Sequence, residues 1–220
     1  MSVFVSFEGP EGSGKTTQLQ ALKRYLEARG LPVYAPREPG GTRISDLVRS
    51  IVLNPEHTEM KPQTEILLFS AARAQLVGQE IQPRLERGEI VLSDRYADST
   101  LAYQGYGLGL DLDTLRAITR FATGGLIPDL TFCLDVPVRA GLMRKRGQDA
   151  AEWNRMEQRE LDYHERVRAG YLEMARADPR RWRIVDATGP FDRVQAAIRA
   201  EVDRLLAEKS EPQRHREHGD

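Results

Sequence analysis

A glycine-rich segment near the N-terminus has the residue types and the spacing of a phosphate-binding loop. Its residues are Gly9, Pro10, Glu11, Gly12, Ser13, Gly14, Lys15 and Thr16, which match the pattern G-x-x-x-x-G-K-S/T. Glycines let successive backbone N–H groups turn toward phosphate oxygens, and a following helix adds the positive end of its dipole. In such a loop the lysine reaches the β- and γ-phosphates, and the threonine hydroxyl ligates Mg²⁺. This segment, the phosphate cradle, therefore predicts binding of a nucleoside triphosphate such as ATP.

An aspartate and an arginine, Asp94 and Arg95, follow the apolar run Ile90–Leu92. Ligands of open α/β sheets bind at the carboxyl ends of the strands, so a pair at this position can reach a bound nucleotide. The aspartate can hold Mg²⁺ or its waters, and the arginine offers a fork of N–H donors to a second phosphate. The same two residues could instead cap a helix and form an ion pair.

Phe69 and Arg73 are four residues apart in a helical run, so they share one helix face. A ring beside a guanidinium suits a flat base, because the ring stacks on it while the guanidinium donates hydrogen bonds to a carbonyl edge. Taken singly, the phenylalanine is more typical of a core and the arginine of a surface.

A basic cluster is the third feature outside the cradle. Arg144, Lys145 and Arg146 stand together, and Arg155 and Arg159 follow in a segment dense in both charges. In isolation such a run is usual for a solvated helix face. Close to a triphosphate it could form a lid that folds over the γ-phosphate.

Strand-like and helix-like runs alternate along the chain and would position these groups. The expected strands are Val3–Phe7, Val33–Ala35, Ile90–Leu92, Leu130–Leu134 and Arg183–Val185. Apolar residues at helical spacing predict helices over Leu19–Leu26, Ile44–Ile51, Thr64–Gln79 and Val194–Leu205, with Pro83 as a break or a new start after the third. This alternation is typical of a parallel sheet with right-handed crossovers and helices on both faces. The triplet Gly105, Gly107 and Gly109 has no strand before it and predicts a flexible loop.

Length and composition suit one α/β domain, which we expect over residues 1–207, with a polar, disordered tail at 208–220. The 32 basic and 33 acidic side chains give a net charge of -1, which argues against a protein that coats nucleic acid. The single cysteine, Cys133, excludes a disulfide framework and a multi-cysteine metal site. No run approaches the roughly 20 apolar residues that span a membrane, and no signal peptide is visible, so we expect a cytoplasmic protein.

Several longer strings are specific enough to compare with a known family. They are Phe7–Thr17, Arg37–Thr42, Ser93–Tyr96 with Ser99, Ala102–Gly105, Pro128–Leu130 and Leu134–Val136. On these strings the chain resembles bacterial thymidylate kinases, from Val3 to about Leu206. The resemblance implies the P-loop nucleoside-monophosphate-kinase fold: a five-stranded parallel sheet, flanking helices and a mobile lid at about residues 143–156. It also implies the reaction ATP + dTMP → ADP + dTDP in dTTP biosynthesis, with Mg²⁺, and a homodimer.

The resemblance also implies which residues bind the acceptor, dTMP: Glu11, Arg37, Phe69, Arg73, Arg95, Thr100, Tyr103 and Gln104. Arg95 should clamp the dTMP phosphate with Arg37 nearby, and Glu11 should bind the 3′-hydroxyl. Phe69 should stack on thymine, while Arg73 should donate to its O4 and repel the amine of cytosine.

Two further positions complete the implied acceptor site. Thr100 lies where the family has a small polar residue beside the base, and Tyr103 should pack under the sugar and leave no room for a 2′-hydroxyl. The residues implied for ATP are those of the cradle, and those implied for the metal are Thr16 and Asp94.

The acceptor phosphate is already ionised at neutral pH, so the implied reaction needs no general base and reduces to positioning and charge neutralisation. Lys15 and Arg95 are the expected catalytic cations. Some thymidylate kinases carry a further arginine in the cradle just after the acidic residue, where this chain has Gly12. The lid should then supply it, and the candidates are Arg144, Arg155 and Arg146, which we favour because Gly147 would let it swing inward.

Two other functions remain open at this stage. A kinase for UMP or CMP would need different base and sugar contacts. A nucleotide-operated switch that hydrolyses ATP slowly would need a residue to position the attacking water, and the sequence offers no clear candidate. A kinase needs a second phosphate site, which Arg95 and Arg37 would supply.

Overall fold

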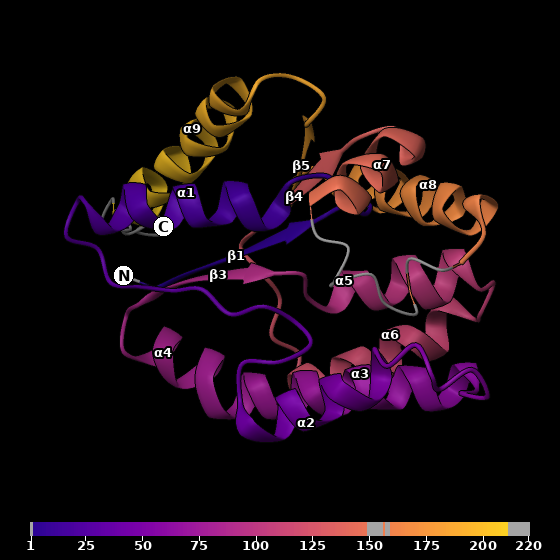
Figure 1. The fold of residues 1–220 in the computed structure, drawn as a ribbon. Coiled ribbons are helices and arrows are strands. Elements are labelled where there is room, and N and C mark those ends of the chain that lie inside the picture. The colour runs from indigo at the N-terminus through magenta and orange to yellow at the C-terminus, as the bar shows by residue number, and fades with distance from the viewer. Residues whose placement is uncertain (1, 149–155, 157–158, 211–220) are drawn as a thin grey trace, which may run out of the picture.

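The structure is a computed structural model that describes residues 2–148, 156 and 159–210 of the chain. Its centre is a parallel sheet of five strands in the order β2-β3-β1-β4-β5 (Figure 1). The strands are β1 (Val3–Glu8), β2 (Val33–Tyr34), β3 (Ile90–Asp94), β4 (Leu130–Asp135) and β5 (Trp182–Asp186). Every strand expected from the sequence is present, and the expected α/β fold with a five-stranded parallel sheet is confirmed.

Helices cover both faces of this sheet, with α1 and α9 above it and α3, α4 and α6 below it in Figure 1. The α-helices of the described residues are α1 (Lys15–Glu27), α2 (Arg43–Val52), α3 (Pro62–Leu76), α4 (Gln82–Glu86), α5 (Ala97–Thr100), α6 (Leu112–Thr123), α7 (Val138–Gln148), α8 (Leu161–Ala177) and α9 (Phe191–Ser210). Two π-helical turns are η1 (Val77–Ile81) and η2 (Leu101–Gly107).

The central strand β1 divides its side chains between two cores, because successive residues of a strand point to opposite faces. Val3, Val5 and Phe7 pack with apolar residues of α1 and α9. Phe4 points the other way, into a core that includes side chains of α3 and η1. By the same alternation Glu8 is directed to the Phe4 face, where it is fully buried.

The order of the strands creates the place for a ligand. From β1 the chain moves to one side for β2 and β3, and then to the other side for β4 and β5. Such a reversal opens a crevice at the carboxyl ends of the strands. The cradle follows β1 directly at its carboxyl end. Asp94, the last residue of β3, is the register partner of Phe7, so it lies beside the end of β1. The sheet therefore brings the cradle and the Asp94–Arg95 pair together.

The cradle needs glycine at two points where it packs against other elements. Gly9 has a φ of 133° and Gly12 a φ of 66°, values that residues with a side chain rarely adopt. A Cβ at Gly9 would collide with the carbonyl oxygen of Leu134 in β4, and a Cβ at Gly12 with that of Gly141 in α7. The loop is therefore held tightly between the sheet and the helix that begins the predicted lid.

Of the break or new start predicted at Pro83, the structure has the new start. α3 ends at Leu76, the π-helical turn η1 follows directly, and α4 begins at Gln82. The wider turn places the proline in the first turn of α4, where the missing N–H costs little. The chain therefore stays helical from Pro62 to Glu86.

The predicted loop around the glycine triplet is also wrong, because η2 is helical and buries Gly105 and Gly107. A Cβ at Gly107 would meet the ring of Tyr163 in α8, so the glycine lets the two elements pack closely.

The C-terminal boundary differs from the prediction as well. α9 runs through Ser210, so residues 208–210 are helical and not part of a disordered tail. Lys209 Nζ donates to Asp129 Oδ1 at 2.7 Å and ties this end of α9 to the segment before β4. The rest of the predicted tail, 211–220, and residues 149–155 of the predicted lid lie outside the described residues. Among the described residues, no helix is long and apolar enough to cross a membrane.

Candidate active site

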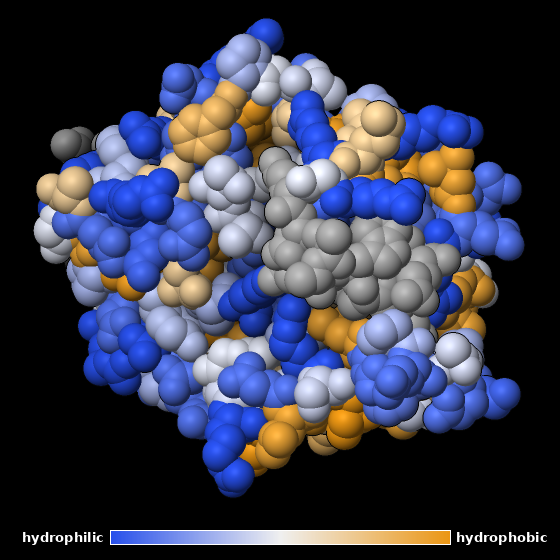
Figure 2. Space-filling view, in the orientation of Figure 1, coloured by the Kyte–Doolittle hydropathy of each residue, from blue (hydrophilic) through white to orange (hydrophobic). Residues whose placement is uncertain are grey.

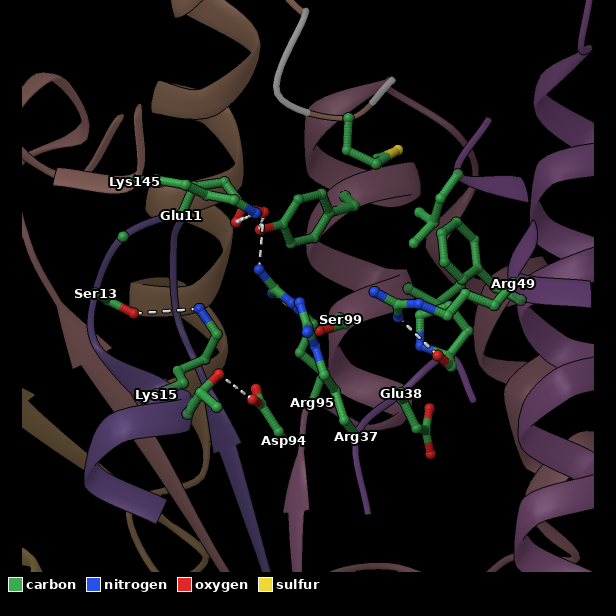
Figure 3. A pocket seen from close by; sticks show the side chains of 18 of the residues that line it. Glu11, Ser13, Lys15, Arg37, Glu38, Arg49, Asp94, Arg95, Ser99 and Lys145 are labelled. Atoms are coloured by element: carbon green, nitrogen blue, oxygen red, sulfur yellow. Dashed lines mark hydrogen bonds and ion pairs between the residues drawn. The ribbon is translucent and has the colours of Figure 1, made fainter. Parts of the chain in front are cut away.

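A cavity of about 440 Å³ opens at the carboxyl ends of β1 and β3 (Figure 3). Its lining comes from the cradle and α1 (Glu11, Gly12, Ser13, Gly14, Lys15, Thr16, Thr17), the segment after β2 (Arg37, Glu38, Pro39), α2 and α3 (Arg49, Leu53, Phe69, Arg73), β3 to η2 (Asp94, Arg95, Ser99, Thr100, Tyr103, Gln104), and Lys145 and Met156. All eight residues implied for the acceptor thus share one cavity with the cradle.

Lys15 lies inside the cradle with its ammonium group bound to the loop itself. Nζ donates to Gly9 O at 3.0 Å, to Pro10 O at 2.8 Å and to Ser13 Oγ at 3.2 Å. Burial, and then the positive charge of Arg95, lowers the pKa of Lys15 to about 8. A cation held in so little water attracts a phosphate more strongly than an exposed one does.

Two oxygen groups suited to Mg²⁺ lie together at the base of the cradle. Thr16 Oγ1 donates to Asp94 Oδ2 at 2.5 Å, which joins the first turn of α1 to the end of β3. Mg²⁺ commonly takes one or two oxygen ligands from a protein and the others from phosphates and waters. Among the described residues, no group of three or more His, Cys, Asp or Glu could hold a metal ion alone. The residues present therefore fit a magnesium ion that arrives with a nucleotide.

Arg95 has a φ of 74°, a conformation that residues other than glycine rarely adopt. This turn directs its guanidinium back over the cradle, where Nη1 donates to Gly9 O at 3.3 Å and Nη2 to Glu11 Oε1 at 2.8 Å. Nη1 also donates to the hydroxyls of Ser99, at 3.4 Å, and Tyr171, at 3.2 Å. A planar fork fixed beside the cradle is placed to bind a second phosphate.

Glu11 puts a carboxylate inside the cradle and is surrounded by cations. Besides Arg95, Lys145 Nζ of α7 lies 3.5 Å from Glu11 Oε2, and Tyr103 Oη donates to Glu11 Oε1 at 2.6 Å. Burial alone would raise the pKa of Glu11, but the charges of Arg95, Lys145 and Lys15 hold it well below its ordinary value. Glu11 is therefore ionised and holds Arg95 and Lys145 at the mouth of the cradle (Figure 3).

Arg73 of α3 is buried in the wall of the cavity that faces the cradle, although a single arginine is more typical of a surface. Nε donates to Glu38 Oε2 at 2.7 Å, Nη1 to Thr100 Oγ1 at 2.9 Å and Nη2 to Tyr96 O at 3.1 Å. The ion pair with Glu38 is what permits its burial, because an unpaired charge there would be costly. Phe69, one helical turn earlier in α3, is half-buried and lines the same wall.

Two more residues of the implied acceptor set lie at the edges of this wall. Arg37 makes an isolated backbone bridge with Asp94, which brings it to the edge of the sheet that carries Arg95. Gln104 Nε2 of η2 donates to Glu65 Oε1 of α3 at 2.7 Å, so it joins the helix that carries Phe69 and Arg73 to the turn that carries Tyr103.

The basic cluster on α7 contributes a lysine to the cavity, where we expected an arginine. Lys145 lines the cavity, whereas Arg146 is exposed and lies outside the lining. Arg144 donates to Ala187 O at 3.0 Å, on the segment after β5. Arg155 lies outside the described residues. The preference for Arg146 finds no support in this arrangement, and a catalytic role for one of the three arginines stays a prediction.

The comparison with known proteins decides the family. The family model for thymidylate kinase matches residues 7–198. The chain belongs to the thymidylate kinase family. A thymidylate kinase from Roseiflexus sp. (strain RS-1) is 59% identical, over 94% of this chain and 96% of its own length. One from Deinococcus radiodurans is 52% identical, over 91% of this chain and 96% of its own length.

A solved structure agrees with this assignment. The crystal structure of thymidylate kinase from Ehrlichia chaffeensis superposes with a TM-score of 0.74 at 31% identity, and covers 93% of this chain and 98% of that one. The resemblance inferred from the residue strings is thereby confirmed. Members of the thymidylate kinase family are nucleoside monophosphate kinases that phosphorylate dTMP to dTDP in dTTP synthesis, so this chain is an enzyme of that class.

Several lining residues of this thymidylate kinase family member were not predicted from its sequence. Glu38 stands inside the Arg37–Thr42 string, so the signal for it was available. Arg49 donates to Pro39 O at 2.7 Å, which nothing in the spacing of α2 indicates. Leu53 and Met156 are apolar, and an apolar lining residue cannot be distinguished from a core residue by its type.

Proposed function

We propose that this chain transfers the γ-phosphoryl group of ATP to dTMP and releases ADP and dTDP for dTTP biosynthesis in the cytoplasm. One observation carries the proposal: Arg95 donates to Gly9 O of the cradle at 3.3 Å, so a cation for a second phosphate lies beside the site for the first. A nucleotide switch needs one phosphate site, whereas a kinase needs two in line.

The residues around Arg95 give the acceptor its sugar and phosphate contacts in this proposal. Arg95 and Arg37 bind the dTMP phosphate. Tyr103 forms the floor under the deoxyribose. The guanidinium of Arg95 lies 4.8 Å from the centroid of the Tyr103 ring, so the floor and the phosphate site are neighbours. Glu11 binds the 3′-hydroxyl with the carboxylate that Tyr103 Oη contacts.

The wall formed by α3 selects the base. Phe69 stacks on the pyrimidine, and Arg73 donates to a carbonyl at the position of thymine O4. Because Glu38, Thr100 and Tyr96 fix the guanidinium, it cannot turn to accommodate the amine of cytosine. Gln104 completes the wall beside the base.

The chemistry needs positioning and charge neutralisation and no general base, because the attacking phosphate oxygen is already ionised. Lys15 binds the β- and γ-phosphates, and Arg95 holds the attacking phosphate in line with them. Thr16 and Asp94 would hold Mg²⁺, which would supply positive charge to neutralise the phosphates. One of Arg144, Arg146 and Arg155 supplies a further charge when the lid closes.

The test is the rate of ADP release with ATP and one monophosphate at a time: dTMP, dUMP, dCMP, UMP or CMP, and none. The proposal predicts rapid release with dTMP, slower release with dUMP and little with the others. Faster release with UMP or CMP would instead make this family member a kinase for a different nucleotide. Equal release without any acceptor would favour the nucleotide switch.

We also propose that the chain forms a homodimer through α2, α3 and α6. Large apolar side chains are exposed on these helices: Ile44, Leu47 and Ile51 on α2, Leu67 on α3 and Phe121, which is 91% exposed, on α6. Apolar side chains also gather along the lower edge of the molecule in Figure 2, over α2 and α3. A surface of this kind is typical of an interface, and a second copy of the chain would cover it.

A further inference from the structure

Glu8 is a buried carboxylate that the proposed reaction does not use. It is the last residue of β1 and has no exposed surface. Its Oε2 accepts hydrogen bonds from Ser99 Oγ at 2.6 Å and from Tyr171 Oη at 2.8 Å, and its Oε1 accepts one from Tyr96 N at 2.7 Å. These donors come from α5, α8 and the turn after β3, so one carboxylate joins three elements beneath the cavity.

The two hydroxyls that bind Glu8 also bind Arg95. Arg95 Nη1 donates to Ser99 Oγ at 3.4 Å and to Tyr171 Oη at 3.2 Å. A hydroxyl has one proton to donate and two lone pairs to accept with. When that proton is directed at the carboxylate of Glu8, a lone pair is left to face the guanidinium. Ser99 Oγ and Tyr171 Oη also lie 2.8 Å from each other, so the two hydroxyls and the carboxylate form one hydrogen-bond network. As the only anion among the described residues that accepts from these hydroxyls, Glu8 draws their protons toward itself and leaves lone pairs facing Arg95.

Glu8 also fixes the backbone on which Arg95 stands. Arg95 adopts its left-handed φ of 74° between two anchored peptides. Its own N–H donates to Phe7 O at 3.0 Å, next to Glu8 in β1, and the N–H of Tyr96 donates to Glu8 itself. A strained conformation persists only where its surroundings hold it. Glu8 supplies one of these anchors, and Ser93 Oγ supplies another by donating to Arg95 O at 2.6 Å.

We propose that Glu8 is a positioning residue that aims the Arg95 guanidinium at the acceptor phosphate through the hydroxyls of Ser99 and Tyr171 and the N–H of Tyr96. This inference rests on the proposed function, in which Arg95 binds the phosphate of dTMP. Glu8 itself touches no substrate, because it lies beneath the cavity and does not line it.

The substitution Glu8→Gln separates the charge of this residue from its shape. Glutamine has nearly the same volume, but one acceptor oxygen becomes an NH₂ group with two donors. If that group binds a lone pair of Ser99 or Tyr171, the proton of that hydroxyl loses its acceptor and turns to the other hydroxyl or toward the cation of Arg95. If it faces Tyr96 instead, it opposes the N–H of Tyr96, so either orientation disturbs the support of Arg95. Burial, and then the nearby Asp98, raises the pKa of Glu8 to about 7, so the comparison belongs at about pH 8, where the carboxylate is mainly ionised.

The experiment is isothermal titration of dTMP and of thymidine into the wild-type chain, Glu8→Gln, Arg95→Ala and the double variant. Because thymidine lacks the phosphate that Arg95 binds, Glu8→Gln should weaken dTMP binding about tenfold and leave thymidine binding unchanged. In the Arg95→Ala background, Glu8→Gln should have no further effect on dTMP, since Glu8 acts through Arg95.

Asp98→Asn is the matched control. Asp98 is a buried carboxylate in the same region, but it pairs with Arg181 at 2.6 Å and makes no hydrogen bond with Arg95. Its loss should leave the ratio of dTMP to thymidine affinity unchanged. If Glu8→Gln does not fold, Tyr171→Phe removes one of the two hydroxyls and should lower dTMP affinity severalfold without affecting thymidine.

The proposal is overturned if Glu8→Gln binds dTMP as tightly as the wild type, or if it weakens dTMP and thymidine equally. Wild-type affinity for dTMP in both Tyr171→Phe and Ser99→Ala would overturn the hydroxyl route. A wild-type chain that binds dTMP no more tightly than thymidine would contradict the proposed phosphate site itself, and the role of Glu8 would fall with it.

Discussion

At the scale of single residues, Glu11 is the least expected member of the site, because a carboxylate inside an anion-binding loop should repel phosphate. The structure resolves this through its neighbours. Arg95, Lys145 and Lys15 keep Glu11 ionised, and Glu11 in turn orients two of these cations. The net charge of this group remains positive, so the loop can hold an anionic nucleotide although it contains a carboxylate, as the proposed contact of Glu11 with the 3′-hydroxyl requires.

Phe69 and Arg73 should contribute differently to base selection. Phe69→Ala should weaken binding of dTMP and dCMP alike, by about 1–3 kcal/mol, because stacking does not depend on the base edge. Arg73→Ala should cost dTMP more than dCMP, because only thymine offers a carbonyl at that position. The check is kcat/KM for both nucleotides, with Arg43→Ala, an exposed change on α2, as the control. Equal losses for both nucleotides in Arg73→Ala would contradict the hydrogen-bond role.

The depressed pKa of Lys15 predicts a pH dependence of nucleotide binding. The folded-state pKa of about 8 means that the free protein loses this positive charge as the pH rises through about 8, so ATP affinity should fall there. Titrations of ATP between about pH 7 and pH 10 measure this. Lys15→Arg should remove the transition, since a guanidinium stays charged over this range. A wild-type affinity that stays constant across it would contradict the assignment.

The same shift fixes the sign of the effect of Lys15 on stability. Its folded-state pKa lies below its unfolded value of 10.5, so between about pH 8 and 10.5 the unfolded chain binds more protons. The contribution of Lys15 to the free energy of unfolding should therefore rise with pH in that window and be least favourable below it.

The cradle residues could be predicted from the sequence because their spacing is local and their chemistry depends on the backbone. Asp94 and Arg95 could be predicted because they end an apolar strand. Lys145 could not be chosen over Arg146, because adjacent helix residues point in directions about 100° apart and only packing decides which one faces the cradle.

At the scale of elements, Glu65 of α3 joins its helix to η2 and to the segment before α8. It lies in α3 with 1% of its surface exposed, and accepts from Gln104 Nε2 of η2 at 2.7 Å. Its other oxygen accepts from Arg159 Nη2, just before α8, at 2.9 Å. The helix that carries Phe69 is therefore tied to the chain that leaves the predicted lid.

Removing this carboxylate should destabilise the fold. Glu65→Ala leaves the charge of Arg159 and the amide of Gln104 in a largely buried place, and should lower the free energy of unfolding by about 3 kcal/mol. Urea denaturation measures this. Asp113→Ala, which breaks an exposed ion pair with Arg116 on α6, is the control and should cost less than about 1 kcal/mol. If both variants lose a similar free energy of unfolding, the buried ion pair of Glu65 contributes no more to stability than an exposed pair, and the prediction is wrong.

The strands were predictable because apolar runs bounded by turn residues mark buried parallel strands. The π-helical turns η1 and η2 were not, because one extra residue per turn is invisible in a pattern of period 3.6. This is why the sequence left a break and a new start open at Pro83 and predicted a loop at Gly105, where the chain stays helical.

At the scale of the whole molecule, the fold class could be predicted from the alternation of strands and helices, but that alternation does not give the strand order β2-β3-β1-β4-β5. That order places β1 at the centre and its cradle beside Arg95. The residue strings gave the family, and the comparisons confirm it.

The proposed homodimer predicts a change in mass when its apolar surface is charged. Leu47→Asp with Phe121→Asp should give a monomer in sedimentation experiments, because a carboxylate buried without a partner is too costly for the interface. Met143→Asp, on α7 away from α2, is a control that replaces another exposed apolar side chain and should leave the dimer intact. A wild-type chain that sediments as a monomer, or a doubly charged variant that remains dimeric, would contradict the proposed interface.

The central claim is that two phosphate sites lie side by side, so that ATP gives its phosphoryl group to dTMP and not to water. The most direct measurement follows the label from ATP that carries a radioactive γ-phosphate. We expect the label in dTDP, in a one-to-one ratio with ADP, and Arg95→Ala should slow this transfer at least about a hundredfold. Label that appears in inorganic phosphate at the same rate with and without dTMP would contradict the account.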